Sequence, residues 1–158
     1  MSSKVTPADI AAAKKGSWIM SDNMIYGLFL SESFSDKKLK EVLGSILHVN
    51  SSDIVVVEDI AELGEAVDVI VERDSRGGEF PCFLTVYVSV PVAKTELDVA
   101  CELSREFECD ALYPGDSDNP YLFELIQPNL KVSTVLLKDD PLDERGEAVL
   151  CKGDDIVL

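Results

Sequence analysis

The chain reads SDKKLKEVLGSILH between residues 35 and 48. Its apolar residues recur at the spacing i, i+3, i+4, i+7 and i+8, which places them on one face of an α-helix. Ser35 stands at the position of an N-cap, and charged residues occupy the opposite face. The stretch therefore predicts an amphipathic helix that packs on a core through Leu39, Val42, Leu43, Ile46 and Leu47.

Apolar runs on both sides of this helix have the length and composition of β-strands. Residues 24–30 (MIYGLFL) precede the helix, and further strands are expected at Ile54 to Glu58, Ala66 to Arg73 and Phe80 to Val90. The last two flank the turn residues 74–78, so we expect them to form an antiparallel hairpin.

A second helix is predicted from about Lys94 to Phe107, because residues 95–98 (TELD) carry the capping-box pattern. We expect its inner face to hold Leu97, Ala100, Cys101, Ser104 and Phe107.

The C-terminal third predicts shorter elements. Strands are expected at Ala111 to Tyr113, Tyr121 to Gln127 and Lys131 to Leu137, then a helical turn from Asp139 to Gly146 and an edge strand at Ala148 to Cys151. Runs of strands between isolated helices favour an α+β fold, in which two main amphipathic helices cover one face of a largely antiparallel sheet.

The length of 158 residues fits one domain. Residues 1–22 are expected to form an N-terminal arm with a short helix, since Thr6, Pro7 and Asp9 provide helix-start signals. Residues 23–158 are then expected to form a single α+β domain.

The charge indicates the class of partner. Thirty acidic against fourteen basic residues leave a formal net charge of −16. Such a field repels nucleic acid and anionic membranes, and it attracts basic proteins. The first twenty residues lack the apolar core of a secretory signal, and the run from Pro81 to Ala93 is too short to span a bilayer. A cytoplasmic protein is expected.

The cysteines and the histidine offer little chemistry. Cys82, Cys101, Cys109 and Cys151 form no CxxC pair, so buried free thiols are expected, and a bond between Cys101 and Cys109 stays open. The single histidine, His48, ends the first helix, where a helix-end contact is favoured over a catalytic base. We expect no enzymatic activity, no cofactor and no metal.

The stretch from Glu108 to Tyr121 is the most unusual. Its acidic turn fails the EF-hand pattern, because Pro120 occupies the fifth position counted from Asp116. Three interpretations of this turn remain open. In order of preference, it is a turn whose side chains bond their own backbone, a loop that contacts a partner, or a metal site. The contact interpretation rests on nine acids and one base between Glu96 and Glu124, and on tyrosines at both ends of the turn. Its partner-binding residues are Asp110, Tyr113, Asp116, Asp118, Asn119, Tyr121 and Glu124.

A second acidic region, from Glu58 to Glu79, holds eight acids and two arginines and is an alternative interface.

In size, acidity, α+β organisation and lack of a catalytic set, the whole chain resembles the bacterial contact-dependent-inhibition and polymorphic-toxin immunity proteins as a group. The resemblance implies a monomer or weak homodimer that neutralises a basic toxin domain, usually a nuclease. Carboxylates such as Asp116, Asp118 and Glu124 would then mimic phosphates and occlude the active cleft.

Two alternatives stay open. From Ser35 onward, the order helix, three strands, helix, two strands is similar to the small acidic type III secretion chaperones, which implies an obligate dimer that binds an effector protein. A strand before the first helix departs from that pattern, as does the lack of a long final helix. A metal-dependent enzyme is the third and least favoured interpretation.

Overall fold

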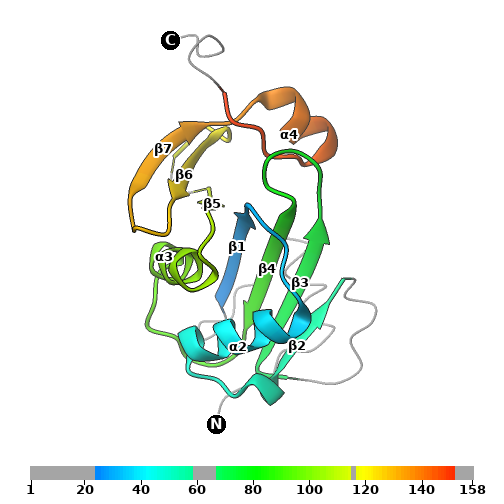
Figure 1. Ribbon diagram of the computed structural model, residues 1–158, viewed down its shortest axis with the longest axis vertical. Coiled ribbons are helices and arrows are strands. Elements are labelled where there is room, and N and C mark those ends of the chain that lie inside the picture. Colours follow the sequence, from blue (N-terminus) through cyan, green and yellow to red (C-terminus); the bar gives the residue numbers. More distant parts are fainter. Residues whose placement is uncertain (1–23, 59–66, 115–116, 152–158) are drawn as a thin grey trace. The chain divides into compact units, whose positions relative to one another are not determined.

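The computed structural model describes residues 24–58, 67–114 and 117–151 (Figure 1). These residues contain seven strands, three α-helices and one 3-10 helix, η1 (Ser51–Asp53), which confirms the predicted α+β class. The predicted N-terminal arm of residues 1–22, with its short helix, lies outside the described residues.

The seven strands form one sheet in the order β2-β3-β4-β1-β5-β6-β7. β1 (Met24–Leu30) has the predicted bounds and pairs antiparallel with β5 (Ala111–Tyr113). β6 (Leu122–Ile126) and β7 (Val132–Leu136) extend the antiparallel pairing to one edge of the sheet (Figure 1). The strand predicted at Ala111 to Tyr113 is confirmed with its bounds, and those predicted at Tyr121 to Gln127 and Lys131 to Leu137 are confirmed, each slightly shorter than expected.

The first half of the sheet contains a parallel pair that the sequence did not predict. β2 (Ile54–Val57) and β3 (Val69–Ser75) run in the same direction. β3 and β4 (Cys82–Val88) are neighbours and form the predicted hairpin, whose loop is closed by the hydrogen bond from Arg76 N–H to the carbonyl of Pro81 at 2.7 Å. β3 begins and ends later than predicted.

The described residues divide into two compact units that interleave along the chain, and strands β1, β3 and β4 contribute residues to both. The prediction of a single domain over residues 23–158 stays a prediction. Unit 1 comprises residues 24–27, 34–58, 67–74 and 84–94, and unit 2 comprises residues 28–33, 75–83, 95–114 and 117–151.

In unit 1, α2 (Asp36–Leu47) forms where the apolar spacing predicts it, and its five predicted core residues are all buried. The Ser35 hydroxyl caps the helix by accepting a hydrogen bond from a first-turn backbone N–H at 3.2 Å. At the other end, Lys94 Nζ donates to the carbonyl of Ile46 at 2.7 Å, so a cation satisfies one of the carbonyls that a helix end leaves open.

The first three residues of β3 are buried on both faces of the strand. Val69, Ile70 and Val71 are each 0% exposed, although successive side chains of a strand point to opposite sides. Ile70 packs with Val57 and Tyr87 in one apolar cluster. The three consecutive apolar side chains therefore identify β3 as an interior strand, in agreement with its place between β2 and β4.

In unit 2, α3 (Glu96–Phe107) begins at the predicted capping box. Thr95 Oγ1 accepts from the Asp98 N–H at 3.1 Å, and the Asp98 carboxylate accepts from the Thr95 N–H at 3.2 Å. The helix contacts β5 and β6. The buried hydroxyl of Ser104 donates to the carbonyl of Cys109 at 2.6 Å, just beyond the end of the helix, and its oxygen lies 3.3 Å from the carbonyl oxygen of Ile126 on β6.

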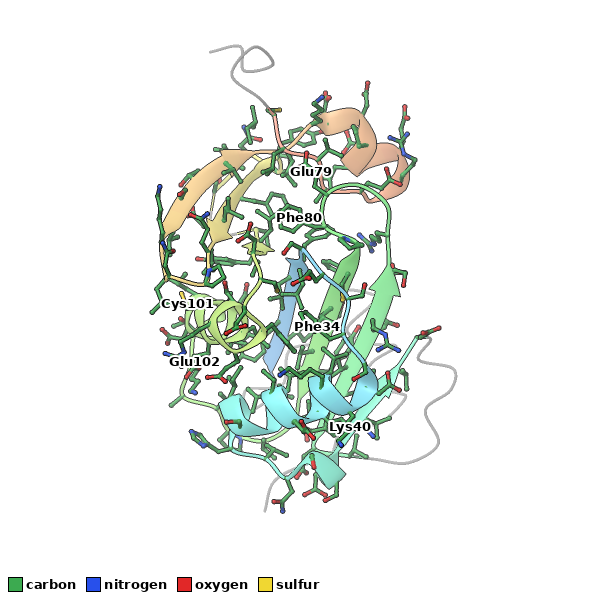
Figure 2. All side chains as sticks on the ribbon, in the orientation of Figure 1. Phe34, Lys40, Glu79, Phe80, Cys101 and Glu102 are labelled. Carbon is green, nitrogen blue, oxygen red and sulfur yellow. The ribbon has the colours of Figure 1, made fainter. Side chains whose placement is uncertain are left out.

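The predicted inner face of α3 is wrong in part. Leu97 is 37% exposed and Cys101, labelled in Figure 2, is only half-buried, whereas Val99 and Leu103 are buried. Both stripes satisfy the helical spacing, so the periodicity does not choose between them. The contact of α3 with β5 and β6 selects which stripe is buried, and the spacing of residues within the helix does not determine that contact.

The core of unit 2 contains a cluster of tilted aromatic rings against which an arginine packs. The rings of Phe29 and Phe83 lie 4.7 Å apart, and Phe123 lies 6.1 Å from Phe29. The Arg76 guanidinium is 4.3 Å from the centre of the Phe83 ring, and its Nη1 donates to the carbonyl of Gly146 at 3.0 Å. Arg76 therefore connects the loop after β3 to the C-terminal segment.

α4 (Asp139–Arg145) forms at the predicted helical turn and ends at Gly146, whose φ of 64° is the left-handed conformation that glycine adopts readily. The edge strand predicted at Ala148 to Cys151 is wrong as a strand: this segment makes only isolated bridges, to Gly78 and to Leu137. No helix in the described part of the chain is both long and apolar enough to cross a membrane.

Candidate functional site

The predicted partner-binding residues lie in unit 2, and the structure separates them into groups. Asp110 precedes β5 and is half-buried, and its backbone N–H donates to the Ser31 hydroxyl at 3.0 Å. Tyr113 lies at the other end of β5, about 10 Å further along the strand. Asp116 lies outside the described residues.

Tyr113 and Glu124 are brought together. They are direct cross-strand partners on β5 and β6, and Glu124 in turn faces Thr134 on β7. Direct partners share one face of a sheet. Thr134 Oγ1 donates to Glu124 Oε1 at 3.1 Å, so the sheet itself already uses one oxygen of this carboxylate.

The acidic turn before β6 bonds its own backbone. The Ser117 hydroxyl accepts from the Asn119 N–H at 3.1 Å, and Asn119 Oδ1 accepts from the Tyr121 N–H at 2.9 Å. These contacts are the ones expected when serine and asparagine stabilise a turn. The Asp118 side chain is exposed beside them.

Asn119 and Tyr121 also line a pocket of about 510 Å³ together with the start of α4. The Tyr121 hydroxyl donates to Asp143 Oδ2 at 2.7 Å, which ties the turn to α4. We call this arrangement the Tyr121 surface and define it as Asn119, Tyr121, Asp139, Asp140 and Asp143. Asp143 belongs to it through the hydrogen bond to Tyr121 and does not line the pocket, whose other lining residues are Leu136, Leu137, Lys138, Pro141 and Cys151.

The electrostatics of the Tyr121 surface are dominated by carboxylates. The pKa of Tyr121 is raised, first because its hydroxyl donates to Asp143 and further because Asp139 and Asp140 lie near it. The phenol therefore stays protonated and keeps its hydroxyl directed at Asp143. Arg145 on the same helix is ion-paired with Glu147 at 3.0 Å and does not line the pocket, whereas Lys138 does.

Three carboxylates of this surface, on Asp139, Asp140 and Asp143, were not predicted as site residues. Their sequence DDPLDER is visible as a helix start, but nothing local indicates that α4 returns to Tyr121. The contact joins residues 22 positions apart, and only the tertiary structure reveals it.

Unit 1 has a second pocket, of about 460 Å³, at the C-terminal end of α2. His48 lies on its rim in the left-handed conformation (φ 57°) as the C-cap, which is the predicted helix-end role. Lys94 also lines the pocket, and its ammonium group is held by the carbonyl of Ile46. Both residues thus stabilise the C-terminal end of α2.

The four cysteines are free thiols, so Cys101 and Cys109 do not form a disulfide. Cys82 and Cys109 are buried as predicted, whereas Cys101 and Cys151 are half-buried. Burial raises the pKa of Cys109 to about 11, so this thiol is protonated and unreactive at neutral pH.

Comparison of the chain with protein-family models, curated proteins and solved structures finds no match. Among the described residues, no group of three or more His, Cys, Asp or Glu side chains is arranged to hold a metal ion. What the Tyr121 surface offers chemically is a set of carboxylate acceptors around an aromatic ring, which suits the guanidinium and ammonium groups of a protein.

Proposed function

We propose that this chain is an immunity protein that acts in the bacterial cytosol by binding a basic toxin domain, of the nuclease class, and occluding its active site. The observation that carries the proposal is the Tyr121 surface. Exposed carboxylates of Asp139, Asp140 and Asp143 surround a half-buried tyrosine at the edge of a pocket.

The net charge and the position of Tyr121 both favour binding to a basic domain. The net charge of −16 accelerates the encounter with a basic domain by long-range attraction. Affinity then depends on a few anchors, and a tyrosine held in place by Asp143 is a suitable one, because its ring presents apolar area at little cost in conformational entropy. The neighbouring carboxylates accept the arginine and lysine donors with which a nuclease holds phosphate.

The test compares three baits of the full-length chain in a capture from the host lysate, with the products of adjacent reading frames included. The first bait is the wild type. The second replaces Asp139, Asp140 and Asp143 by Asn, which removes three charges from the Tyr121 surface.

The third bait is the matched control, in which three other exposed acids, Glu41, Glu106 and Glu108, are replaced by Gln. It loses the same charge from other places. The proposal expects the wild type and the control to retain one basic domain stoichiometrically, and the second bait to lose most of it. The nuclease activity of the captured domain should fall to background on adding one equivalent of wild type.

Other outcomes contradict the proposal. Equal capture by all three baits means that the partner does not use the Tyr121 surface, and a partner without inhibited activity means that the chain is not an immunity protein. Recovery of an unfolded effector segment by a dimeric bait supports the secretion-chaperone alternative instead.

A further inference from the structure

The outer edge of β7 is the feature that carries a further inference. In unit 2, β7 is the last strand of the sheet and pairs with β6 on one side only (Figure 1). The Leu137 N–H donates to the Tyr121 carbonyl, and the Gln127 N–H donates to the Lys131 carbonyl. Because backbone groups alternate along a strand, the odd-numbered residues of β7 direct their N–H and C=O groups at β6.

The even-numbered residues direct theirs outward. Two of these positions are used by the C-terminal segment: Cys151 N–H donates to the Leu136 carbonyl, and Lys138 N–H donates to the Val149 carbonyl, both at 2.8 Å. Val132 and Thr134 come next along the same edge. Within residues 24–58, 67–114 and 117–151, no backbone group pairs with their outward N–H and C=O groups.

This open stretch leads to the Tyr121 surface. Leu136 and Lys138, which continue the edge beyond Thr134, line the same pocket as Tyr121. The side chain of Val132 is 42% exposed and provides apolar contact area beside the backbone groups. Backbone donors, apolar area and an acidic pocket thus follow one another along one line.

We propose that the outer edge of β7 receives an extended segment of the basic partner as an added strand, and that an arginine or lysine of this segment enters the Tyr121 surface. Strand addition of this kind takes affinity from main-chain hydrogen bonds and specificity from side-chain pockets. The inference rests on the proposed function for the nature of the partner, but the edge is an independent structural feature.

The charges along the edge determine which end of the added strand is basic. Asp139, Asp140 and Asp143 outnumber Lys138 at the α4 end. At the other end lies the exposed Lys131. A basic side chain is therefore favoured at the α4 end, and a neutral or acidic one beside Lys131.

The first measurement is amide hydrogen exchange by NMR on the full-length chain without a partner. The amides of Val132 and Thr134 should exchange fast, whereas those of Ser133 and Val135, which face β6, should exchange slowly. Slow exchange at Val132 and Thr134 means that another part of the chain already covers the edge, and it overturns the inference.

The second measurement uses defined probes: the hexapeptide Thr-Val-Thr-Val-Thr-Arg, its reversed sequence, and both peptides with Glu in place of Arg. Addition of an Arg peptide should protect the Val132 and Thr134 amides and shift the resonances of Tyr121. Each Glu peptide should bind at least about five-fold more weakly than its Arg counterpart, in line with the loss of one charge-assisted contact.

The variant Val132→Pro removes one outward N–H and leaves the groups that face β6 in place, and proline is tolerated at the first residue of a strand. Val132→Thr keeps the N–H and is the matched control. We expect Val132→Pro to bind the Arg peptide about five-fold more weakly than wild type does, and Val132→Thr to bind it with an affinity within about two-fold of wild type.

Unchanged affinity in Val132→Pro, or peptide-induced shifts confined to other surfaces, overturns the edge as the binding site. Neither result bears on the capture experiment, which tests whether the chain binds a basic partner at all. The two proposals therefore fail separately.

Discussion

Replacement of Arg76 by Ala should destabilise the fold by an amount that follows from the contacts of its guanidinium. The group lies 4.3 Å from the centre of the Phe83 ring and 5.7 Å from that of Phe29. A half-buried cation–π contact of this kind contributes about 1 kcal/mol. The hydrogen bond from Nη1 to the Gly146 carbonyl, at 3.0 Å, contributes about 1.5 kcal/mol because its donor is charged.

Together the two contributions predict a loss of about 2 to 3 kcal/mol in the free energy of unfolding of Arg76→Ala. The variant Arg76→Lys keeps the positive charge but loses the planar stacking, so we expect about half of that loss. Arg105→Ala is the matched control. Arg105 is exposed, and its ion pair with Glu106 is 3.7 Å long, so its removal should change stability by less than about 0.5 kcal/mol.

The assay is urea unfolding followed by circular dichroism, with wild type and all three variants measured side by side. With a urea slope of about 2 kcal/mol per molar, the Arg76→Ala midpoint should fall by roughly 1 M. A midpoint within about 0.2 M of wild type would refute the reasoning, since the stack over Phe83 and the bond to Gly146 would then contribute nothing. An equal loss in Arg105→Ala would show that the effect comes from net charge.

Further predictions concern the core and the tight turn. Gly78 has a φ of 85°, and an added Cβ would lie 2.9 Å from the carbonyl oxygen of Ala148, so Gly78→Ala should lower the free energy of unfolding by about 1 to 3 kcal/mol in urea titration. Ser104→Ala removes the buried hydroxyl that donates to the carbonyl of Cys109 at 2.6 Å and should cost about 1 to 2 kcal/mol in the same assay, whereas a loss below about 0.3 kcal/mol would contradict it. The pKa of Cys109 is raised from 9.0 to about 11 by burial, so the unfolded chain loses this proton first, and stability should fall as pH rises from about 9 to 11. Urea midpoints of Cys109→Ala should fall less steeply across that pH window than those of wild type.

Local signals in the sequence were sufficient for most of the secondary structure. The apolar spacing after Ser35 and the capping box at Thr95 both mark helices whose first turns the structure confirms. The run from Met24 to Leu30 is a strand with the predicted bounds. These features depend on backbone capping and side-chain period, which neighbouring residues determine.

Features that depend on distant residues were not predictable in the same way. The inner face of α3 was misassigned at Leu97 and Cys101, because two stripes of the helix have similar apolar content and only the contact with the sheet selects one. The parallel pairing of β2 with β3 has no local signature. The hydrogen bond from Tyr121 to Asp143 links the turn to α4, and it joins residues 22 positions apart in two polar segments that carry no local signal of the contact.

Calorimetric titration with the captured basic domain measures whether the Tyr121 surface binds a basic protein. The titration is made into three proteins: wild type, the variant with Asn at 139, 140 and 143, and the control with Gln at 41, 106 and 108. We expect the Asn variant to bind the domain at least about ten-fold more weakly than wild type at 150 mM salt, and the Gln control to bind it within about three-fold of wild type. Equal weakening of both variants would mean that net charge alone is recognised, and no weakening in either would place the interface elsewhere; each result contradicts the claim.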